Sequence, residues 1–171
     1  MWLGRYPSGL DDLARSLVDD LVGAGFQAWA VDEISRSKAA KLLGNVGNGL
    51  DLLEGDDDER AAARVALRRE SVEVLDAAGV GLPPGGALVG ATLDILPVEG
   101  HVSGRLSTWQ SFARGTSSEV DYLNGEVVLL ARRHGATAPL NERLQRLLGD
   151  PSAERTLASL LAVAAVDSSL V

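Results

Sequence analysis

The sequence predicts a mainly helical domain that follows a short strand–helix–strand segment. Hydrophobic residues make up 46% of the 171 residues and charged residues 23%, which is typical of a globular protein. Aromatic residues account for only 4%. The core must therefore be built from Leu, Val and Ala, and a core of this kind favours packed helices. Apolar residues at helical spacing fill most of the chain, whereas the strand-like segments lie within residues 1–34.

The N-terminal segment reads as strand, helix and strand. Apolar residues from Leu10 to Leu21 recur every three or four positions, and aspartates occupy the opposite face. We expect Ser8 to cap this helix and Gly25 to end it, with a short strand over 26–31. Such a segment cannot close a sheet by itself. We expect it to pair with another chain or to fold against the rest of this one.

Helices should dominate the remainder of the chain. We expect one helix over 35–53 and another over 59–78, which Gly79 would end. The acidic turn 54–58 lies where its carboxylates favour the N-terminus of the second of these helices. Five further helices are predicted, over residues 91–96, 107–113, 117–134, 141–148 and 153–166.

The composition excludes several classes of function. A net charge of −8 disfavours nucleic acids and anionic membranes as partners. The chain has no cysteine, its acidic turn lacks EF-hand spacing, and no metal site is expected. The two histidines, His101 and His134, are expected at the surface. The longest apolar stretch, 160–166, is too short to cross a bilayer and no signal peptide is visible, so we expect a cytoplasmic protein.

One polar constellation lies in the predicted helix 35–53. On a continuous helix Lys41, Asn45 and Asn48 would lie within roughly 60° of one another. A lysine that donates to a carbonyl oxygen, with asparagines that fix the substrate, is the chemical interpretation. A solvent-facing polar stripe, with Gly44 and Gly47 serving helix packing, is the structural alternative, and spacing alone favours it.

Two capping boxes form the second constellation. Ser107 to Gln110 and Thr116 to Glu119 each place a hydroxyl at a helix N-cap and an acceptor three residues later. Helix capping alone explains both. If the two helix N-termini lie close together, however, their free N–H groups would also suit a carboxylate ligand. Glu119 would then act as a cap, as an acceptor for a substrate hydroxyl, or as both.

These motifs, taken in order, resemble the ketopantoate reductase family. In that family the matching stretch carries a serine, a Gly-Arg or Arg-Gly pair, Thr-Glu-Ile-Asp and Asn-Gly. Further upstream the family has Lys-Leu-x-x-Asn. The matching residues here are Lys41-Leu42-Leu43-Gly44-Asn45, Ser107-Thr108-Trp109-Gln110, Arg114-Gly115, Thr116-Ser117-Ser118-Glu119-Val120-Asp121, Asn124-Gly125, His134-Gly135, Pro139 and Asn141.

The resemblance implies a fold and an activity. The family reduces 2-dehydropantoate to pantoate with NADPH, on the route to pantothenate. Its fold pairs a Rossmann domain with a helical C-terminal domain of the 6-phosphogluconate dehydrogenase C-terminal-like type. Residues 1–34 would be a remnant of the nucleotide-binding domain. Residues 35–171 would be the helical substrate-binding and dimerisation domain.

The resemblance also assigns roles to individual residues. Lys41 matches the catalytic lysine that acts on the substrate carbonyl. Asn45 matches a substrate-binding asparagine, and Asn48 lies near a second one. Ser107 matches the serine that binds the carboxylate, and Glu119 the glutamate that contacts the substrate hydroxyls.

The chain departs from the family in two ways. Ser111 stands where the family usually has aspartate, and no Gly-x-Gly-x-x-Gly follows any predicted strand. We therefore expect NADPH not to bind tightly to this chain alone. The chain would act on a small 2-keto acid together with a separate Rossmann-domain chain, and a homodimer is the default expectation. The alternative is a non-catalytic helical module that dimerises or binds a small acid.

Overall fold

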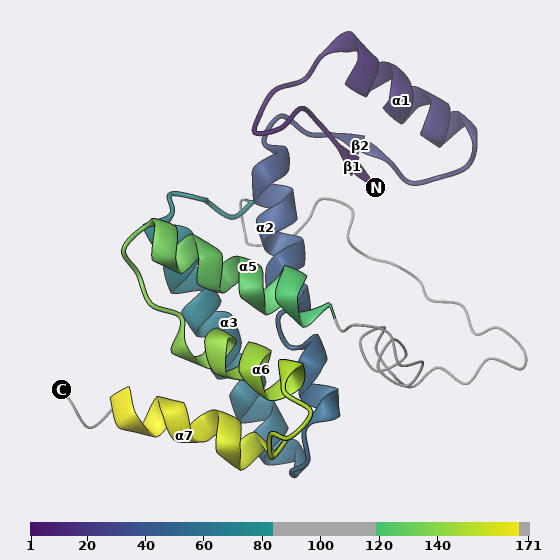
Figure 1. The fold of residues 1–171 in the computed structure, drawn as a ribbon. Coiled ribbons are helices and arrows are strands. Elements are labelled where there is room, and N and C mark those ends of the chain that lie inside the picture. The colour runs from purple at the N-terminus through teal and green to yellow at the C-terminus, as the bar shows by residue number, and fades with distance from the viewer. Residues whose placement is uncertain (84–118, 168–171) are drawn as a thin grey trace, which may run out of the picture. The chain divides into compact units, whose positions relative to one another are not determined.

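The computed structural model describes residues 1–83 and 119–167, and helices make up most of them (Figure 1). The predicted fold class, a mainly helical domain with a small β-α-β segment at its start, is confirmed. The helices are α1, α2, α3, α5, α6, α7 and the 3-10 helix η1, and the strands are β1 and β2. In chain order they are β1 (Trp2–Leu3), α1 (Asp12–Gly23), β2 (Trp29–Ala30), α2 (Ile34–Asn45), η1 (Asn48–Leu52), α3 (Asp57–Ala77), α5 (Val120–Arg133), α6 (Pro139–Gly149) and α7 (Leu157–Asp167).

The described residues fall into two compact units. The first unit contains residues 1–41 and 80–83, and the second contains residues 42–79 and 119–167. Helix α2 begins in the first unit and ends in the second. The domain boundary predicted after residue 34 lies at the start of this helix and stays a prediction.

The first unit is built on a parallel pair of strands. β1 and β2 pair with Trp2 opposite Trp29 and Leu3 opposite Ala30, and α1 is the connection between them. The rings of Trp2 and Trp29 stack with centroids 5.8 Å apart. The predicted strand–helix–strand order is therefore confirmed, although β2 is shorter than the strand expected over 26–31.

The start of α1 differs from the prediction. Asp11, not Ser8, caps the helix, since its carboxylate accepts a hydrogen bond from Ala14 N at 2.9 Å. Ser8 lies inside a turn that Arg5 N closes on Gly9 O at 2.8 Å, and Gly9 has φ +111°. The chain is still turning at Ser8, so the helix cannot begin there. At the other end Gly25 adopts φ +88° just beyond the helix, as the predicted stop requires.

The second unit contains one hydrophobic core between α3, α5, α6 and α7 (Figure 1). The core consists of Leu, Val and Ala, which confirms the prediction from composition. Six leucines are completely or almost completely shielded from solvent: Leu50, Leu67, Leu144, Leu147, Leu157 and Leu160. Gly125 lies where α5 faces α6, and a Cβ there would lie 3.0 Å from Gln145 Nε2.

The acidic turn 54–58 leads into α3 as expected. Asp56 is the N-cap of this helix and forms a capping box with Glu59, whose carboxylate accepts from Asp56 N at 3.1 Å. Gly79, with φ +68°, follows the last turn. The helices predicted over 117–134, 141–148 and 153–166 correspond to α5, α6 and α7. Those predicted over 91–96 and 107–113 lie outside the described residues.

The helix predicted over 35–53 is broken. α2 stops at Asn45, and a separate 3-10 helix, η1, begins at Asn48. Close packing explains the break: a Cβ at Gly49 would lie 2.6 Å from Leu148 Cδ1, and one at Gly47 would lie 2.7 Å from an Arg64 nitrogen. Of the two glycines that the sequence offered as packing residues, Gly47 thus lies against α3, whereas Gly44 has no atom within 4 Å of its Cβ position. Gly49, which the sequence did not single out, lets the chain approach α6.

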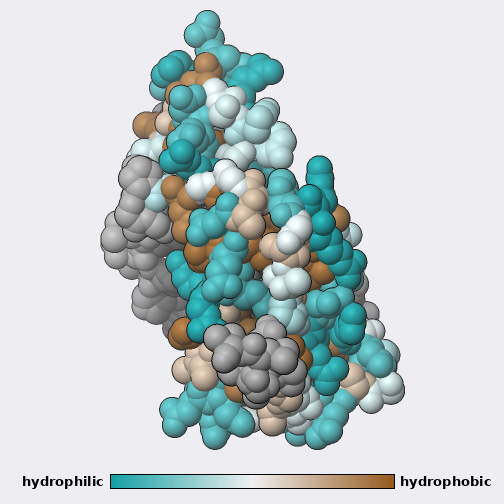
Figure 2. All heavy atoms as spheres, turned by 90° about the vertical axis from the view of Figure 1, so that its left-hand side faces the viewer, coloured by the Kyte–Doolittle hydropathy of each residue, from teal (hydrophilic) through white to brown (hydrophobic). Residues whose placement is uncertain are grey.

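Polar side chains cover much of one face of the described residues (Figure 2). Figure 2 shows one face on which hydrophilic side chains are spread between smaller hydrophobic areas. Among the helices within residues 1–83 and 119–167, none has the length and apolar character to cross a membrane.

Candidate functional site

The predicted lysine and its nearest asparagine both lie on α2. Lys41 is exposed and Asn45 is half-buried. The two residues are separated by about one helical turn, as the predicted spacing requires. Lys41 and Asn45 thus lie on one helix, as predicted, and the helix continues as far as Asn45.

Asn48 does not belong to the same helical stripe. It is the first residue of η1, after α2 has ended, so the angular argument that grouped it with Lys41 and Asn45 is wrong. Its side chain is also not solvent-facing, because the residue is 7% exposed. Among the described residues no side-chain hydrogen bond of Asn48 is present. An unpaired buried amide costs about 1–3 kcal/mol, so Asn48 is a candidate for binding a ligand.

Glu119 lies at the N-cap of α5. It is exposed, and its backbone carbonyl accepts from Tyr122 N and Leu123 N, each at 3.0 Å. Its carboxylate makes no capping hydrogen bond. The capping box predicted for Thr116 to Glu119 required Glu119 at the third helical position, and this part of the prediction is wrong. Ser107 and Thr116 lie outside the described residues.

A buried polar network lies in the second unit, and the sequence motifs did not predict its connections. Glu70, Ser71, Asn124 and Asn141 come from α3, α5 and α6, and all four are buried. Glu70 accepts three hydrogen bonds: Oε1 from Asn141 N at 2.9 Å and from Asn141 Nδ2 at 2.8 Å, and Oε2 from Leu140 N at 2.9 Å. The carboxylate thereby satisfies two free N–H groups in the first turn of α6.

The network continues to the end of α2. Asn124 Nδ2 donates to Asn141 Oδ1 at 2.8 Å and to the backbone oxygen of Val46 at 3.0 Å. Asn141 Nδ2 also lies 3.2 Å from Ser71 Oγ, which donates to Leu67 O at 2.8 Å. The motifs Asn124-Gly125 and Pro139-x-Asn141 were visible in the sequence. Asn124 and Asn141 lie 17 residues apart, but their other partners, Val46, Glu70 and Ser71, lie 70 or more residues away in the chain, and spacing could not identify them.

Two pKa values within the described residues are perturbed by hydrogen bonds. The Arg5 guanidinium bound to Asp11, with the N–H of Ala14, holds the pKa of that carboxyl below its usual value. Hydrogen bonds from Ser152 Oγ at 2.7 Å and Ser152 N at 2.8 Å lower the pKa of Asp150. Both carboxyls are capping or turn residues at the surface. Neither perturbation marks a catalytic group.

The first unit has an apolar groove of about 420 Å³. Its lining includes Trp2, Leu3, Leu13, Ala14, Leu17 and Ile34. Leu13 and Leu17 are exposed, at 67% and 44%. The groove therefore presents apolar side chains beside the strand β1, and it contains none of the predicted site residues.

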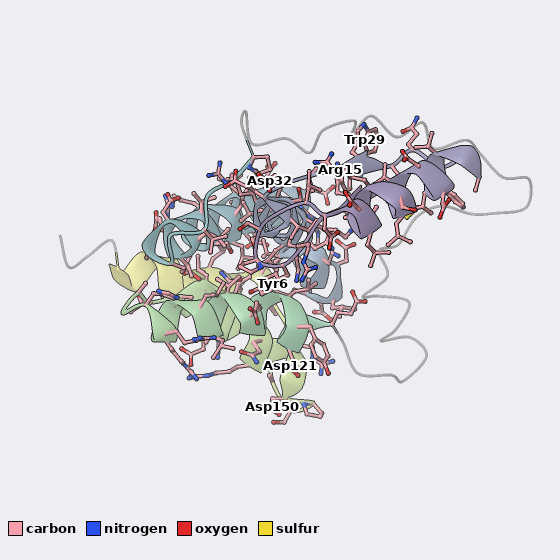
Figure 3. The ribbon with its side chains drawn as sticks, turned by 90° about the horizontal axis from the view of Figure 1, so that it is seen from above. Tyr6, Arg15, Trp29, Asp32, Asp121 and Asp150 are labelled. Carbon is pink, nitrogen blue, oxygen red and sulfur yellow. The ribbon has the colours of Figure 1, made fainter. Side chains whose placement is uncertain are left out.

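The second unit has a polar groove between α5, α6 and the turn after α6. Asp121 and Asp150, which Figure 3 labels, both line it. Most of its polar side chains have hydrogen-bond partners nearby. Gln145 Nε2 donates to Asp121 at 2.7 Å, and Arg132 and Arg146 both contact Glu142 at 2.8 Å. Since these partners satisfy one another, the groove is a weaker candidate for a ligand than the buried Asn48.

His134 is exposed at the C-cap of α5, as predicted, whereas His101 lies outside the described residues.

The sequence also matches a family model over residues 36–151, and that model describes the C-terminal region of ketopantoate reductase PanE/ApbA. The chain belongs to this family. The matched range includes every one of the five predicted site residues. The resemblance inferred from the motifs is thereby confirmed for the family.

Solved structures of ketopantoate reductases share the fold. A 2-dehydropantoate 2-reductase from Methylococcus capsulatus is 23% identical, with a TM-score of 0.69 over 86% of this chain and 49% of that one. A PanE/ApbA family ketopantoate reductase from Ralstonia eutropha JMP134 is 26% identical, with a TM-score of 0.62 over 81% of this chain and 48% of that one. The present chain therefore spans about half the length of these reductases.

Proposed function

We propose that this chain is the substrate-binding part of a ketopantoate-reductase-type enzyme that reduces 2-dehydropantoate to pantoate. The observation that carries the proposal is the family match over residues 36–151, because this range contains the motifs from Lys41 to Glu119. Asn48 supports it, because its amide is buried and has no side-chain hydrogen bond to residues 1–83 or 119–167. The small 2-keto acid supplies the polar groups that such an amide lacks.

Each predicted residue has a role in this proposal. Lys41 donates a hydrogen bond or a proton to the substrate's carbonyl oxygen, which stabilises negative charge developing there. Asn45 and Asn48 bind the substrate and orient it. Ser107 donates to the carboxylate, and Glu119 accepts from the hydroxyl of the acid.

NADPH is not expected to bind tightly to this chain alone. β1 is followed by Gly4-Arg5-Tyr6-Pro7-Ser8-Gly9 and β2 by Val31-Asp32-Glu33, and neither turn is a Gly-x-Gly-x-x-Gly. Pro7 in addition has no N–H to offer a phosphate. The described residues therefore do not fit the pyrophosphate of a dinucleotide, and the proposal assigns the cofactor to another part of the enzyme.

The proposed partner is a nucleotide-binding half that completes the sheet of the first unit. One observation supports a protein partner: exposed leucines of α1 line an apolar groove beside the two-stranded sheet. The length of the solved relatives, about twice that covered here, favours a nucleotide-binding half as the occupant. A homodimer is the alternative, and light scattering on the chain alone at high concentration would detect it as twice the monomer mass.

Isothermal titration calorimetry with ketopantoate tests the binding role. Replacing Ser107 or Glu119 by alanine should weaken binding by about 1.5–3 kcal/mol, that is roughly tenfold to one-hundredfold, because each removes a hydrogen bond to a charged group. Glu73→Ala, which removes an exposed carboxylate on α3, is the control and should bind like the parent. Parent-like affinity in both Ser107→Ala and Glu119→Ala would show that the proposed site is wrong.

An NADPH oxidation assay with ketopantoate tests the enzymatic role. The chain alone should be inactive, and activity should appear when a nucleotide-binding chain is added. The second candidate function, a non-catalytic module that binds a small acid, is favoured by the poor fit of the described turns to a dinucleotide. Ketopantoate binding without activity in the presence of any nucleotide-binding partner would establish that alternative.

A further inference from the structure

The end of α2 is held in place by a buried relay of amide side chains. Asn124 is 1% exposed and Asn141 is completely buried. Asn124 Nδ2 bridges Asn141 Oδ1 and the backbone oxygen of Val46, the residue directly after α2. Carbonyl oxygens at a helix C-terminus lack intrahelical partners. The relay satisfies one of them at the junction between α2 and η1.

The relay has only one possible polarity. Both carboxylate oxygens of Glu70 accept from backbone N–H groups in the first turn of α6, and the group of Asn141 that faces Oε1 is its donor, Nδ2. The Oδ1 atom of Asn141 then faces Asn124, whose Nδ2 group donates one hydrogen bond to it and a second one to Val46 O. If either amide were flipped, two oxygens would oppose each other. The orientation set at Glu70 is thus transmitted to Val46.

The relay lies beside two of the proposed binding residues. Val46 follows Asn45 directly and precedes Asn48 by two residues. We propose that Asn124 and Asn141 are positioning residues, which fix the turn 45–48 so that the amides of Asn45 and Asn48 meet the substrate. This inference rests on the proposed function. Binding geometry of this kind is sensitive, since displacement by about 1 Å can cost up to about one-hundredfold.

Stability alone does not account for such a network. Apolar residues of similar volume often stabilise a core as well as buried polar groups do. A buried network in which every hydrogen bond has one possible direction instead fixes its side chains, and the backbone they hold, in a single arrangement. In the second unit it is connected to the segment that bears Asn45 and Asn48. Satisfying the ends of α6 and α2 accounts for the single bonds, and a positioning role explains in addition why the network ends at the turn that bears Asn45 and Asn48.

The chain offers a matched control within the same network. Ser71 contacts Asn141 Nδ2, but its removal leaves the bonds from Glu70 to Asn141, from Asn141 to Asn124 and from Asn124 to Val46 in place. Ser71→Ala thus removes a buried polar group without interrupting the relay. Asn124→Ala removes both bonds on the path to Val46.

Two measurements on these variants test the inference. In Asn124→Ala, hydrogen exchange of the backbone amides of residues 46–49 should be at least about tenfold faster, and ketopantoate should bind at least about tenfold more weakly. In Ser71→Ala both quantities should stay within about twofold of the parent. Unchanged exchange and affinity in folded Asn124→Ala would overturn the inference, and so would equal losses in both variants.

A measurement on the parent covers the case in which Asn124→Ala does not fold. In the ¹⁵N-labelled chain, the side-chain amide signals of Asn124, Asn45 and Asn48 should shift together during a ketopantoate titration. The amide of Gln145, which donates to Asp121 at the surface, should not shift. A titration that moves Asn48 but leaves Asn124 unchanged would refute the relay. If the parent binds no ketopantoate at all, the proposed function fails, whereas hydrogen exchange in Ser71→Ala and Asn124→Ala still decides the positioning role.

Discussion

The two units of the chain are built on very different cores. In the described part of the first unit, the buried apolar residues are three alanines: Ala14, Ala28 and Ala39. Larger apolar side chains there, such as Leu13 and Phe26, are more than half exposed. The second unit instead buries leucines and valines from α3, α5, α6 and α7, together with a connected polar network.

This contrast indicates which part of the chain is stable by itself. Free energy from burial scales with the apolar area removed from water, and an alanine buries little of it. The first unit, with two strands of two residues each, therefore gains little from its own packing. Its stability should depend on a partner, whereas the second unit should fold without one.

The largest effect is expected in the core of the second unit. Leu144 is completely buried on α6, and Leu144→Ala should lower the free energy of unfolding by about 2–5 kcal/mol. Leu13→Ala on α1 should change it by no more than about 0.5 kcal/mol, because Leu13 is 67% exposed. Urea unfolding followed by far-UV circular dichroism measures both.

The same experiment can report each unit separately. Replacing Trp109 by phenylalanine leaves Trp2 and Trp29 as the chain's tryptophans, and both lie in the first unit. Their fluorescence should change at lower urea than the circular dichroism signal. Coincident transitions, or a large loss in Leu13→Ala, would contradict the difference between the units.

A second prediction concerns the turn where α2 gives way to η1. Gly49→Ala should destabilise the chain by about 1–3 kcal/mol, because the new Cβ would meet Leu148 Cδ1 at 2.6 Å. Gly44→Ala is the matched control: it lies within α2, and no atom lies within 4 Å of the position of its Cβ. It should be neutral or stabilising by up to about 1 kcal/mol. Equal stability of the two variants would show that close packing does not end the helix.

A smaller effect is expected at the start of α3. Asp56→Ala removes the N-cap bond to Glu59 N and should cost about 1 kcal/mol. Asp56→Asn keeps an acceptor at the same position and should recover most of that loss. Thermal unfolding of the parent and the two variants measures both differences in stability. An alanine variant as stable as the asparagine variant would exclude a contribution from the capping box.

The smallest expected effect is the pH response of the first unit. Arg5 lowers the pKa of Asp11 in the folded unit. The ionised carboxylate therefore stabilises the folded unit, and this contribution is complete at pH values above the pKa of Asp11 in the unfolded chain, which is about 4. The contribution is lost as the pH falls from there through the lower folded pKa. Asp11→Asn should reduce the acid sensitivity of the tryptophan signal, whereas Asp19→Asn on the same helix should not. An unchanged pH profile in Asp11→Asn would rule out this ion pair as a source of stability.

Local sequence signals predicted the elements well where the deciding interactions were local. The apolar residues at helical spacing from Leu10 to Leu21 predicted α1, and the acidic turn 54–58 predicted the start of α3. Errors arose at boundaries. Ser8 was a plausible cap by residue type, but the turn closed by Arg5 and Gly9 delays the helix to Asp12.

The sequence predicted only part of the candidate site, because local spacing does not reveal contacts between distant residues. Lys41 and Asn45 were grouped correctly on α2, since spacing within one helix is a local property. Asn48 was placed on the wrong element, because the contacts of Gly47 with Arg64 and of Gly49 with Leu148 join residues far apart in the chain. Spacing carries no information about such contacts.

The sequence by itself determined the family, the helical class and the leucine, valine and alanine core, because composition and motif order are properties of the chain alone. Only the tertiary structure decided that α2 stops at Asn45, that Asn48 is buried, and that Glu70, Asn141 and Asn124 connect α3, α6 and α5 to Val46. Those features depend on side chains brought together from distant positions, where steric exclusion and the pairing of buried polar groups select one arrangement.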